Sequence, residues 1–325
     1  MGWCTTHDLD RFLTEAGGYL SSRAAENTLL LAAAQSVGDA HRDARPVGAP
    51  GGKPDDPEAE ATGPGPLFGW WEPPDGGGTR GAFLHDPAEP LLIAGRAPET
   101  AASLAAALAR AGRSVCGVDA SAEAADAFAA AWSQRAGVAT RVHRHTLVYR
   151  LAGAPAAPGP AEAPRPASGP TGRLRTATVA DRPLLVAWLT AFSAEVGQLT
   201  GVPEASADEL LGYGGAVFWE AGGQPVAMAA VTRPVMRTVR ITMMYTPPEH
   251  RHNGYAVAVT HAVSHAELAR RASEVVLITD SNRPHRQAAQ LGYELIGERA
   301  VLRFGPATGS IPRLPTGPLP RLRSR

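Results

Sequence analysis

Residues 245–256 read Tyr-Thr-Pro-Pro-Glu-His-Arg-His-Asn-Gly-Tyr-Ala, and they decide the fold of the second half of the chain. The stretch lies between an apolar run that ends at Thr246 and a run rich in Ala and Val. Two prolines stop a strand from pairing further, while Gly254 and the small Ala256 favour a tight turn into a helix. Backbone N–H groups at such a helix start converge on one point, where the helix dipole adds roughly half a positive charge. The pattern predicts a pyrophosphate site, to which Arg251 adds a charge-assisted contact.

On either side of this turn, hydrophobic periodicity and turn residues predict an α/β (α+β) fold. Helices are expected to begin at Asp181 and near Ser206, and to cover Tyr255–Arg271 and His285–Leu291. Strands are expected over Ala216–Glu220, Pro225–Thr232, Val239–Thr246, Val275–Thr279 and Tyr293–Phe304, the last as one or two strands. The expected order is two helices, three strands, a helix, a strand, a short helix and the final strand or strands.

In this context residues 245–256 resemble the acetyl-CoA pyrophosphate loop of GNAT (GCN5-related) N-acetyltransferases, whose pattern is Gln/Arg-x-x-Gly-x-Gly/Ala. The strand ending Leu277-Ile278-Thr279-Asp280 and the sequence Leu291-Gly292-Tyr293 follow at spacings similar to those of the family. The resemblance covers roughly residues 174–304. It implies a mixed, mostly antiparallel sheet flanked by helices, in which the strand before the loop and the strand after its helix splay apart.

The resemblance also implies where the cofactor lies. The pantetheine arm of acetyl-CoA is expected in the gap between the splayed strands, and the pyrophosphate at the turn. The cofactor-binding residues that the resemblance implies are Met244, Tyr245, Thr246, Arg251, His252, Asn253, Gly254, Tyr255, Ala256 and Asn282. For Asn282, a solvated loop residue is an equally good interpretation.

The first half of the chain repeats the later part of this pattern, which predicts two GNAT-like copies in tandem. Phe68–Glu72 resembles Phe218–Glu220, and the Ala-rich Glu99–Arg110 resembles the helix that begins at Tyr255. In the first copy, residues 94–100 stand where the phosphate turn belongs, but they lack the Arg-x-x-Gly-x-Ala pattern and carry Glu99. We expect this copy to be a scaffold that binds CoA poorly.

Composition divides the chain. Three segments are rich in Pro, Gly, Ala or Ser and poor in large apolar residues, which is typical of loops, linkers and tails. The predicted organisation is a degenerate GNAT-like domain over residues 1–152 with a disordered insertion over 46–66, a linker over 153–172, a catalytic GNAT domain over 173–304 and a Pro-rich tail over 305–325.

The catalytic residues are less clearly marked. Transfer to an amine needs a group that takes a proton from the ammonium, and a donor helps the thiolate to leave. Many family members place a Tyr four residues before the final Gly-aromatic pair, but that position is Ala288, and the strand before the turn contains no acid. Glu195 is the candidate base, with a solvated surface acid as the alternative interpretation. Tyr245, Ser281 or water is the candidate acid, and departure of the thiolate without an acid is a further alternative.

Charge and cysteine content exclude several classes of protein. Lys plus Arg and Asp plus Glu both number 31, so no net field attracts nucleic acid or an anionic membrane. Two cysteines cannot form a disulfide framework, and no apolar run is long enough to cross a membrane. His261 and His265 have metal-ligand spacing but no third ligand in sequence, so no metal is expected. We expect a soluble, cytoplasmic and bacterial protein of open oligomeric state.

Together these features predict an N-acetyltransferase that moves acetyl from acetyl-CoA to a primary amine of a small molecule or a protein. Two alternatives stay open at this level. One is a transferase that uses a different acyl donor, and the other is a non-catalytic protein that binds acyl-CoA or regulates.

Overall fold

The computed structural model describes residues 2–43, 65–73, 76–153, 171–196, 202–281 and 288–306. The first half contains β1 (Trp3–Thr6), α1 (Leu9–Ser22), α2 (Thr28–Asp43), β2 (Leu67–Trp71), β3 (Gly81–His85), β4 (Leu91–Ala94), α3 (Pro98–Arg110), β5 (Gly117–Ser121), α4 (Ala122–Ala136) and β6 (Val138–Ala152). The second half contains β7 (Arg173–Thr176), the 3-10 helix η1 (Val179–Asp181), α5 (Arg182–Val196), α6 (Pro203–Tyr213), β8 (Ala216–Ala221), β9 (Gln224–Val231), β10 (Thr238–Tyr245), η2 (Pro248–His250), α7 (Tyr255–Ala269), β11 (Glu274–Asp280), η3 (Ala289–Leu291) and β12 (Glu294–Pro306).

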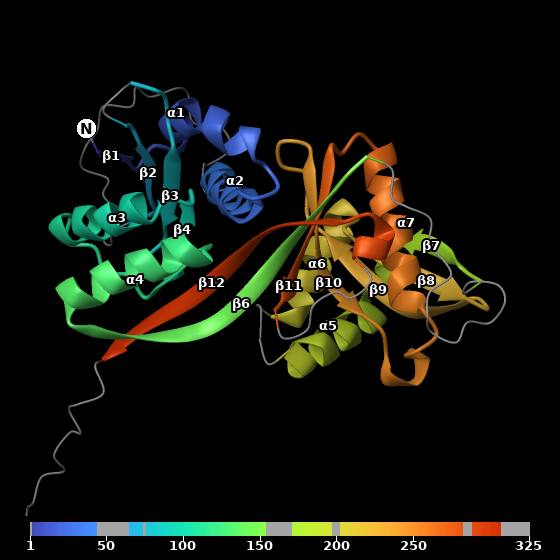
Figure 1. Ribbon diagram of the computed structural model, residues 1–325. Coiled ribbons are helices and arrows are strands. Elements are labelled where there is room, and N and C mark those ends of the chain that lie inside the picture. The colour runs from blue at the N-terminus through green and yellow to red at the C-terminus, as the bar shows by residue number, and fades with distance from the viewer. Residues whose placement is uncertain are drawn as a thin grey trace, which may run out of the picture.

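These strands form one twelve-stranded sheet in the order β1-β2-β3-β4-β5-β12-β6-β11-β10-β9-β8-β7. Among the described strands, β4–β5 and β10–β11 are the parallel neighbours, and every other neighbouring pair is antiparallel. Helices lie against the sheet along its length (Figure 1). The predicted fold class, a mixed and mostly antiparallel sheet flanked by helices, is therefore confirmed.

The two halves exchange their last strands. β6, which ends the first half, pairs antiparallel with β11 of the second half. β12, which ends the second half, pairs antiparallel with β5 of the first half and also runs along β6 over most of its length. Figure 1 shows β6 and β12 as two long strands that pass between the two groups of helices. Each half therefore receives the strand beside β5 or β11 from the other half.

Helices cover both faces of the sheet. α3 and α4 pack on the same face of the sheet as α7. Ala300, which packs under α3 and α4, pairs with His145 of β6 and shares its face. Every second residue of β6 from His145 points to that face, and the last of them, Leu151, packs under α7. α1 and α2 cover the other face in the first half, and α5 and α6 cover it in the second. Between these two helix pairs, Ala25 packs on Val148 near the middle of the sheet.

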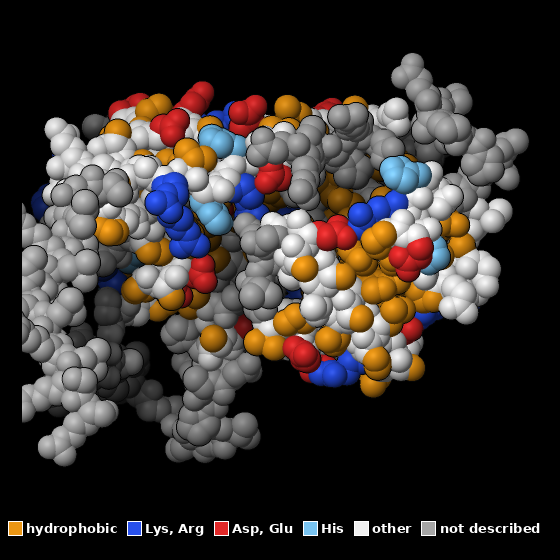
Figure 2. All heavy atoms as spheres, turned by 90° about the horizontal axis from the view of Figure 1, so that it is seen from below, with side chains coloured by type: hydrophobic (Ala, Val, Ile, Leu, Met, Phe, Trp, Pro, Cys, Tyr) orange, Lys and Arg blue, Asp and Glu red, His pale blue; other side chains and the backbone are white. Residues whose placement is uncertain are grey.

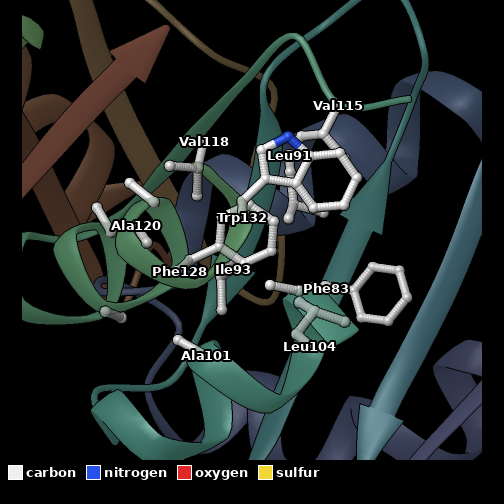
Figure 3. Close-up of a cluster of buried hydrophobic side chains, with 14 of the residues drawn as sticks. Phe83, Leu91, Ile93, Ala101, Leu104, Val115, Val118, Ala120, Phe128 and Trp132 are labelled. Carbon is white, nitrogen blue, oxygen red and sulfur yellow. The ribbon is translucent and has the colours of Figure 1, made fainter. Parts of the chain in front are cut away.

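The core of the first half lies between β3–β5 and the helices α3 and α4. Figure 3 shows the rings of Phe128 and Trp132 from α4 among Leu91 and Ile93 of β4 and Val118 of β5. The two rings stack with centroids 5.9 Å apart and an interplanar angle of 11°. Both helices are rich in alanine, which allows them to pack closely on each other and on the sheet.

Local differences from the sequence predictions have simple causes. The helix expected near Ser206 begins at Pro203, because proline is tolerated in the first turn of a helix, where its missing N–H is not needed. The final segment is one strand, and β7 pairs with β8 as an edge strand that the predicted order omits. Of the helix predicted over His285–Leu291, residues 285–287 lie outside the described residues and η3 forms near its end.

Candidate functional site

The strands β10 and β11 separate and leave a gap. They pair in parallel only as far as Ile241 and Leu277, although β10 continues to Tyr245 and β11 to Asp280. At the same point Thr242 bulges out of the ladder between β10 and β9. Beyond the bulge, the side of β10 that faces β11 has no strand partner in the described part of the chain. Its backbone groups are therefore available to an extended ligand, as the predicted splayed pair requires.

The turn after β10 is shaped by left-handed backbone. His252 has φ 65°, and Gly254, the N-cap of α7, has φ 78°. The Asn253 amide holds the loop by donating to the carbonyls of His250 at 3.1 Å and Arg251 at 3.2 Å. No side chain caps the start of α7, and its first turn contains no acidic residue. The N–H groups of this helix start are therefore suited to an anion.

Arg251 and Glu195 lie together, although the sequence assigned them separate roles. The Nε of Arg251 donates to the carbonyl of Thr246 at 3.0 Å, and its Nη2 donates to Oε1 of Glu195 at 2.5 Å. The pair joins the end of α5 to the start of the loop. In this arrangement Arg251 holds the loop, and Glu195 has a cation as its partner.

Tyr245 and Met244 point to opposite faces of β10. Tyr245 is buried on the α5 side, where its ring centroid lies 5.9 Å from that of Trp188. Burial, and next the negative charge of Glu195, raises the pKa of Tyr245, so this phenol keeps its proton at neutral pH. Met244 lies on the α7 side, where its sulfur accepts a hydrogen bond from Thr260 at 3.0 Å.

Ser281 follows β11 directly, at the far side of the gap. Its N–H donates to the carbonyl of His145 on β6 at 3.0 Å, which continues the β11–β6 ladder. Asn282, predicted to contact the cofactor arm, lies outside the described residues.

Figure 2 shows the molecule from below the view of Figure 1, which is the side on which β10 turns into α7. On this face, basic, acidic and histidine side chains lie beside apolar ones.

The position at which the family has a Tyr is closed in this chain. Ala288 is fully buried under α7, and its carbonyl accepts from the N–H of Tyr293 at 2.9 Å. The nearby Tyr293 hydroxyl is bonded to Ser264 at 2.7 Å, and burial raises its pKa. This tyrosine is therefore a core residue and does not replace the missing acid.

Sequence reasoning missed two polar residues of this region. The hydroxyl of Thr279, on β11 beyond the last pair with β10, is buried without a hydrogen-bond partner among the described residues. The same holds for Nη1 of Arg240, which lies on β10 just before the gap. A Thr or Arg in an otherwise apolar strand gives no signal in sequence, because it has the pattern of a solvated strand face.

The first half has a second gap between parallel strands. β4 and β5 pair only as far as Leu92 and Asp119, and both continue beyond these residues. Here Arg96 occupies the region, donating from Nη2 to the carbonyl of Ile296 at 2.6 Å and pairing through Nε with Glu26 at 3.4 Å. The remaining space is about 30 Å³, which is room for roughly two water molecules.

Neither a metal centre nor a membrane span was predicted. The pKa of His261 is lowered by burial and by His265, four residues on along α7. In the described ranges, no three His, Cys, Asp or Glu side chains come together. No helix among those residues is both long and apolar enough to cross a membrane.

No family model matches the chain, and no curated protein matches its sequence. Solved structures do match. A GCN5-related N-acetyltransferase from Sphaerobacter thermophilus is 16% identical over 76% of this chain and 82% of its own, with a TM-score of 0.50. A Drosophila protein is 12% identical over 74% of this chain and 80% of its own, also with a TM-score of 0.50. A predicted acetyltransferase from Clostridium acetobutylicum, solved with acetyl-CoA, is 20% identical over 39% of this chain and 92% of its own, with a TM-score of 0.33.

These matches concern the fold. The first of them covers 76% of the chain, so it extends beyond the second half, which holds less than half of the residues. The predicted resemblance to GNAT acetyltransferases is confirmed at the level of architecture. Because one fold supports several activities, the function rests on the chemistry of the site.

Proposed function

We propose that the chain is an acyltransferase that moves the acetyl group of acetyl-CoA to a primary amine of a small molecule or a protein. One observation carries the proposal: the gap between β10 and β11 opens directly beside a helix start with an uncapped N-terminus and no acid in its first turn. An extended thiol arm and an anionic pyrophosphate need these two features side by side.

In the proposed complex, the pantetheine arm runs along β10 from the bulge at Thr242 towards Thr246. The backbone of residues 252–256 holds the pyrophosphate, and Arg251 keeps the loop in place through Thr246 and Glu195. Asn282 remains a proposed contact to the arm. No resident metal takes part in this proposal.

The reaction joins the amine nitrogen to the thioester carbonyl carbon and breaks the carbon–sulfur bond. The proton of the amine goes to a base, for which Glu195 is proposed, directly or through water. The leaving sulfur takes a proton from Tyr245, Ser281 or water. Tyr245 suits this role because its raised pKa keeps the proton on the phenol until the thiolate forms.

The first half is proposed to act as a scaffold. The domain bounds given above, a degenerate copy over residues 1–152 and a catalytic domain over 173–304, are part of this proposal. Arg96 in the gap of the first half and Glu99 in the first turn of α3 both support it, because neither leaves room or charge for a pyrophosphate.

A non-catalytic acyl-CoA-binding protein is the second candidate function. The buried Ala288 and the absence of an acid on β10 favour it, because the family's usual proton-transfer groups are missing. A transferase that uses a different acyl donor shares the same site and differs only in the donor.

Calorimetric titration of acetyl-CoA, with thiol release measured across a panel of amines and acyl-CoA donors, separates these candidates. The control variants are Gly254→Glu at the N-cap of α7 and Gly112→Glu, at another left-handed glycine with open space around it. Binding and thiol release by the wild type and Gly112→Glu, both lost in Gly254→Glu, support the proposal. Binding without release from any amine supports the non-catalytic candidate, and absence of binding by the wild type contradicts both.

A further inference from the structure

Arg240 lies on β10 beside the point at which the gap opens. It is in register with Val276 of β11, one residue before the last parallel pair. Val239 and Ile241 on either side of it pack under α7, so Arg240 points to the opposite face of the sheet. Beyond the bulge, Tyr245 lies on this same face and packs with α5. Arg240 therefore lies on the face of the sheet opposite α7, as Tyr245 does.

Among the described residues, the Arg240 side chain forms no salt bridge, and one of its nitrogens has no hydrogen-bond partner. Its backbone pairs with Thr232, but its Nη1 is buried without a hydrogen-bond partner among the described residues. Burial, and next the charge of Arg299, lowers the pKa of Arg240 to about 10, so the guanidinium stays positive at neutral pH. A buried cation without a partner is costly, because water no longer solvates it.

Two of the charged groups that act on Arg240 belong to one ion pair. Arg299 and Asp119 lie close enough to affect the charge of Arg240. Arg299 is already paired with Asp119, donating from Nε at 2.9 Å and from Nη2 at 2.7 Å to Oδ1. Asp119 is thus held by another arginine and does not accept from Nη1 of Arg240. A carboxylate would balance the charge of Arg240, and the planar fork of a guanidinium matches a carboxylate in shape.

We propose that Arg240 binds a carboxylate of the acceptor, so that the acceptor is a small amine that also carries a carboxylate, as an amino acid does. The inference rests on the proposed function, because it requires the acyl group to lie at the end of the β10–β11 ladder. The bulged Thr242 is two positions after Arg240, which is roughly 7 Å of strand. An amine at the thioester and a carboxylate at Arg240 are therefore within reach of one compact molecule.

Charged groups from both halves act on Arg240. Asp119 belongs to β5 of the first half, and Arg299 belongs to β12, the strand that the second half contributes beside it. Their ion pair sets the charge around Arg240 on β10. The carboxylate site is thus built from both halves, and it depends on the exchanged strand to hold Arg299 in place.

The test compares amino acids with their carboxamides as acceptors in the presence of acetyl-CoA. Glycine, alanine, β-alanine, γ-aminobutyrate, glutamate and lysine are each paired with the amide of the same skeleton, and kcat/KM is measured from thiol release. The amine of an α-amino amide is less basic than that of the acid, so more of it is unprotonated at neutral pH. A preference for the acid must then come from the site.

Three variants complete the test: Arg240→Met, Arg240→Lys and the control Arg141→Met, at an exposed arginine of β6. At least one acid should exceed its amide by about 100-fold in the wild type and in Arg141→Met, since loss of a buried charge pair costs several kcal/mol. Arg240→Met should remove this advantage, and Arg240→Lys should restore part of it. The affinity for acetyl-CoA should stay within threefold in every variant.

The outcomes separate the inference from the proposed function. Equal use of acids and amides, release from uncharged amines alone, or an undiminished preference in Arg240→Met would each overturn the carboxylate site while leaving the acyltransferase intact. Absence of acetyl-CoA binding, or of thiol release with any amine, overturns the proposed function and the inference with it.

Discussion

The parallel pairs β4–β5 and β10–β11 begin alike and end differently. Each pair separates after a short ladder, and in each case a helix connects the two strands on the same face of the sheet. In the second half the gap opens at the start of α7, where Gly254 is the N-cap residue and no side chain caps the helix. In the first half, Arg96 reaches the carbonyl of Ile296 and the carboxylate of Glu26. The topology makes a gap in both halves, and a few side chains decide which gap suits a ligand.

The helix starts differ in charge as well as in shape. α3 carries Glu99 in its first turn, which offsets the positive end of the helix dipole. The first turn of α7 has no acid. An anion at α3 would meet a carboxylate, whereas an anion at α7 would meet only backbone N–H groups and the positive end of the dipole.

The largest expected effect tests whether the halves are separate. Phe128→Ala in the core of the first half should lower the free energy of unfolding by about 3–5 kcal/mol, because it empties a fully buried position. Since β6 and β12 join the halves, we expect one unfolding transition that shifts as a whole. Circular dichroism measured against denaturant concentration reports this transition. The control is Val142→Ala, at an exposed position of β6. Two transitions, only one of which moves, would show that the halves unfold independently.

The next effect compares the two helix starts directly. Gly254→Glu should weaken acetyl-CoA binding by roughly 100-fold, because it places a negative charge and a strained left-handed residue at the pyrophosphate. Ala97→Glu at the N-cap of α3 is the position-matched control and should leave the dissociation constant within threefold. Calorimetry measures both. Equal losses in the two variants would argue against a difference between the gaps.

A smaller effect concerns the arginine in the first gap. Arg96→Met removes the side chain that lies there, yet binding should stay at one acetyl-CoA per chain. Glu99 is still in the first turn of α3, and the N-cap of that helix is still Ala97 and not a glycine. Stability should fall by no more than about 1 kcal/mol, since the ion pair with Glu26 is partly exposed. The number of acetyl-CoA molecules bound per chain, measured by calorimetric titration, tests this expectation. Two molecules bound per chain in this variant would mean that Arg96 alone closes the gap.

The smallest effect concerns Tyr245 in the second gap. Glu195→Gln removes a negative charge that opposes the phenolate, so the pKa of Tyr245 should fall towards its ordinary value. Ultraviolet absorbance during a pH titration reports the change, and Tyr245→Phe identifies the signal. Because the folded pKa is raised, the contribution of Tyr245 to stability is present below its unfolded pKa and is lost as pH rises through the folded value. An unchanged or higher pKa in Glu195→Gln would show that the two groups do not interact.

The elements of the second half could be predicted because local signals mark them. Pro247 and Pro248 end β10, Gly254 starts α7, and Gly222 and Gly223 turn β8 into β9 with positive φ. These residues act on their immediate neighbours in sequence, so their effect is visible without the fold. The GNAT-like architecture was implied by the resemblance of residues 245–256 to the family's pyrophosphate loop, in the context of these elements.

The exchange of strands and the side-chain partners could not be predicted. Nothing local in the sequence of β6 or β12 states whether its neighbour is β5 or β11. The same holds for Glu195 with Arg251, which are 56 residues apart. A residue's partners depend on the packed structure, so the sequence alone assigns no role to Arg240.

The central claim is that acetyl-CoA lies between β10 and β11 and not between β4 and β5. A crystal structure of the intact chain with acetyl-CoA tests it most directly. The account predicts an extended pantetheine arm hydrogen-bonded to the backbone of β10 beyond Thr242, with the pyrophosphate at residues 252–256 and Arg96 unmoved in the first gap. Density for the cofactor in the β4–β5 gap, or away from both gaps, would contradict it.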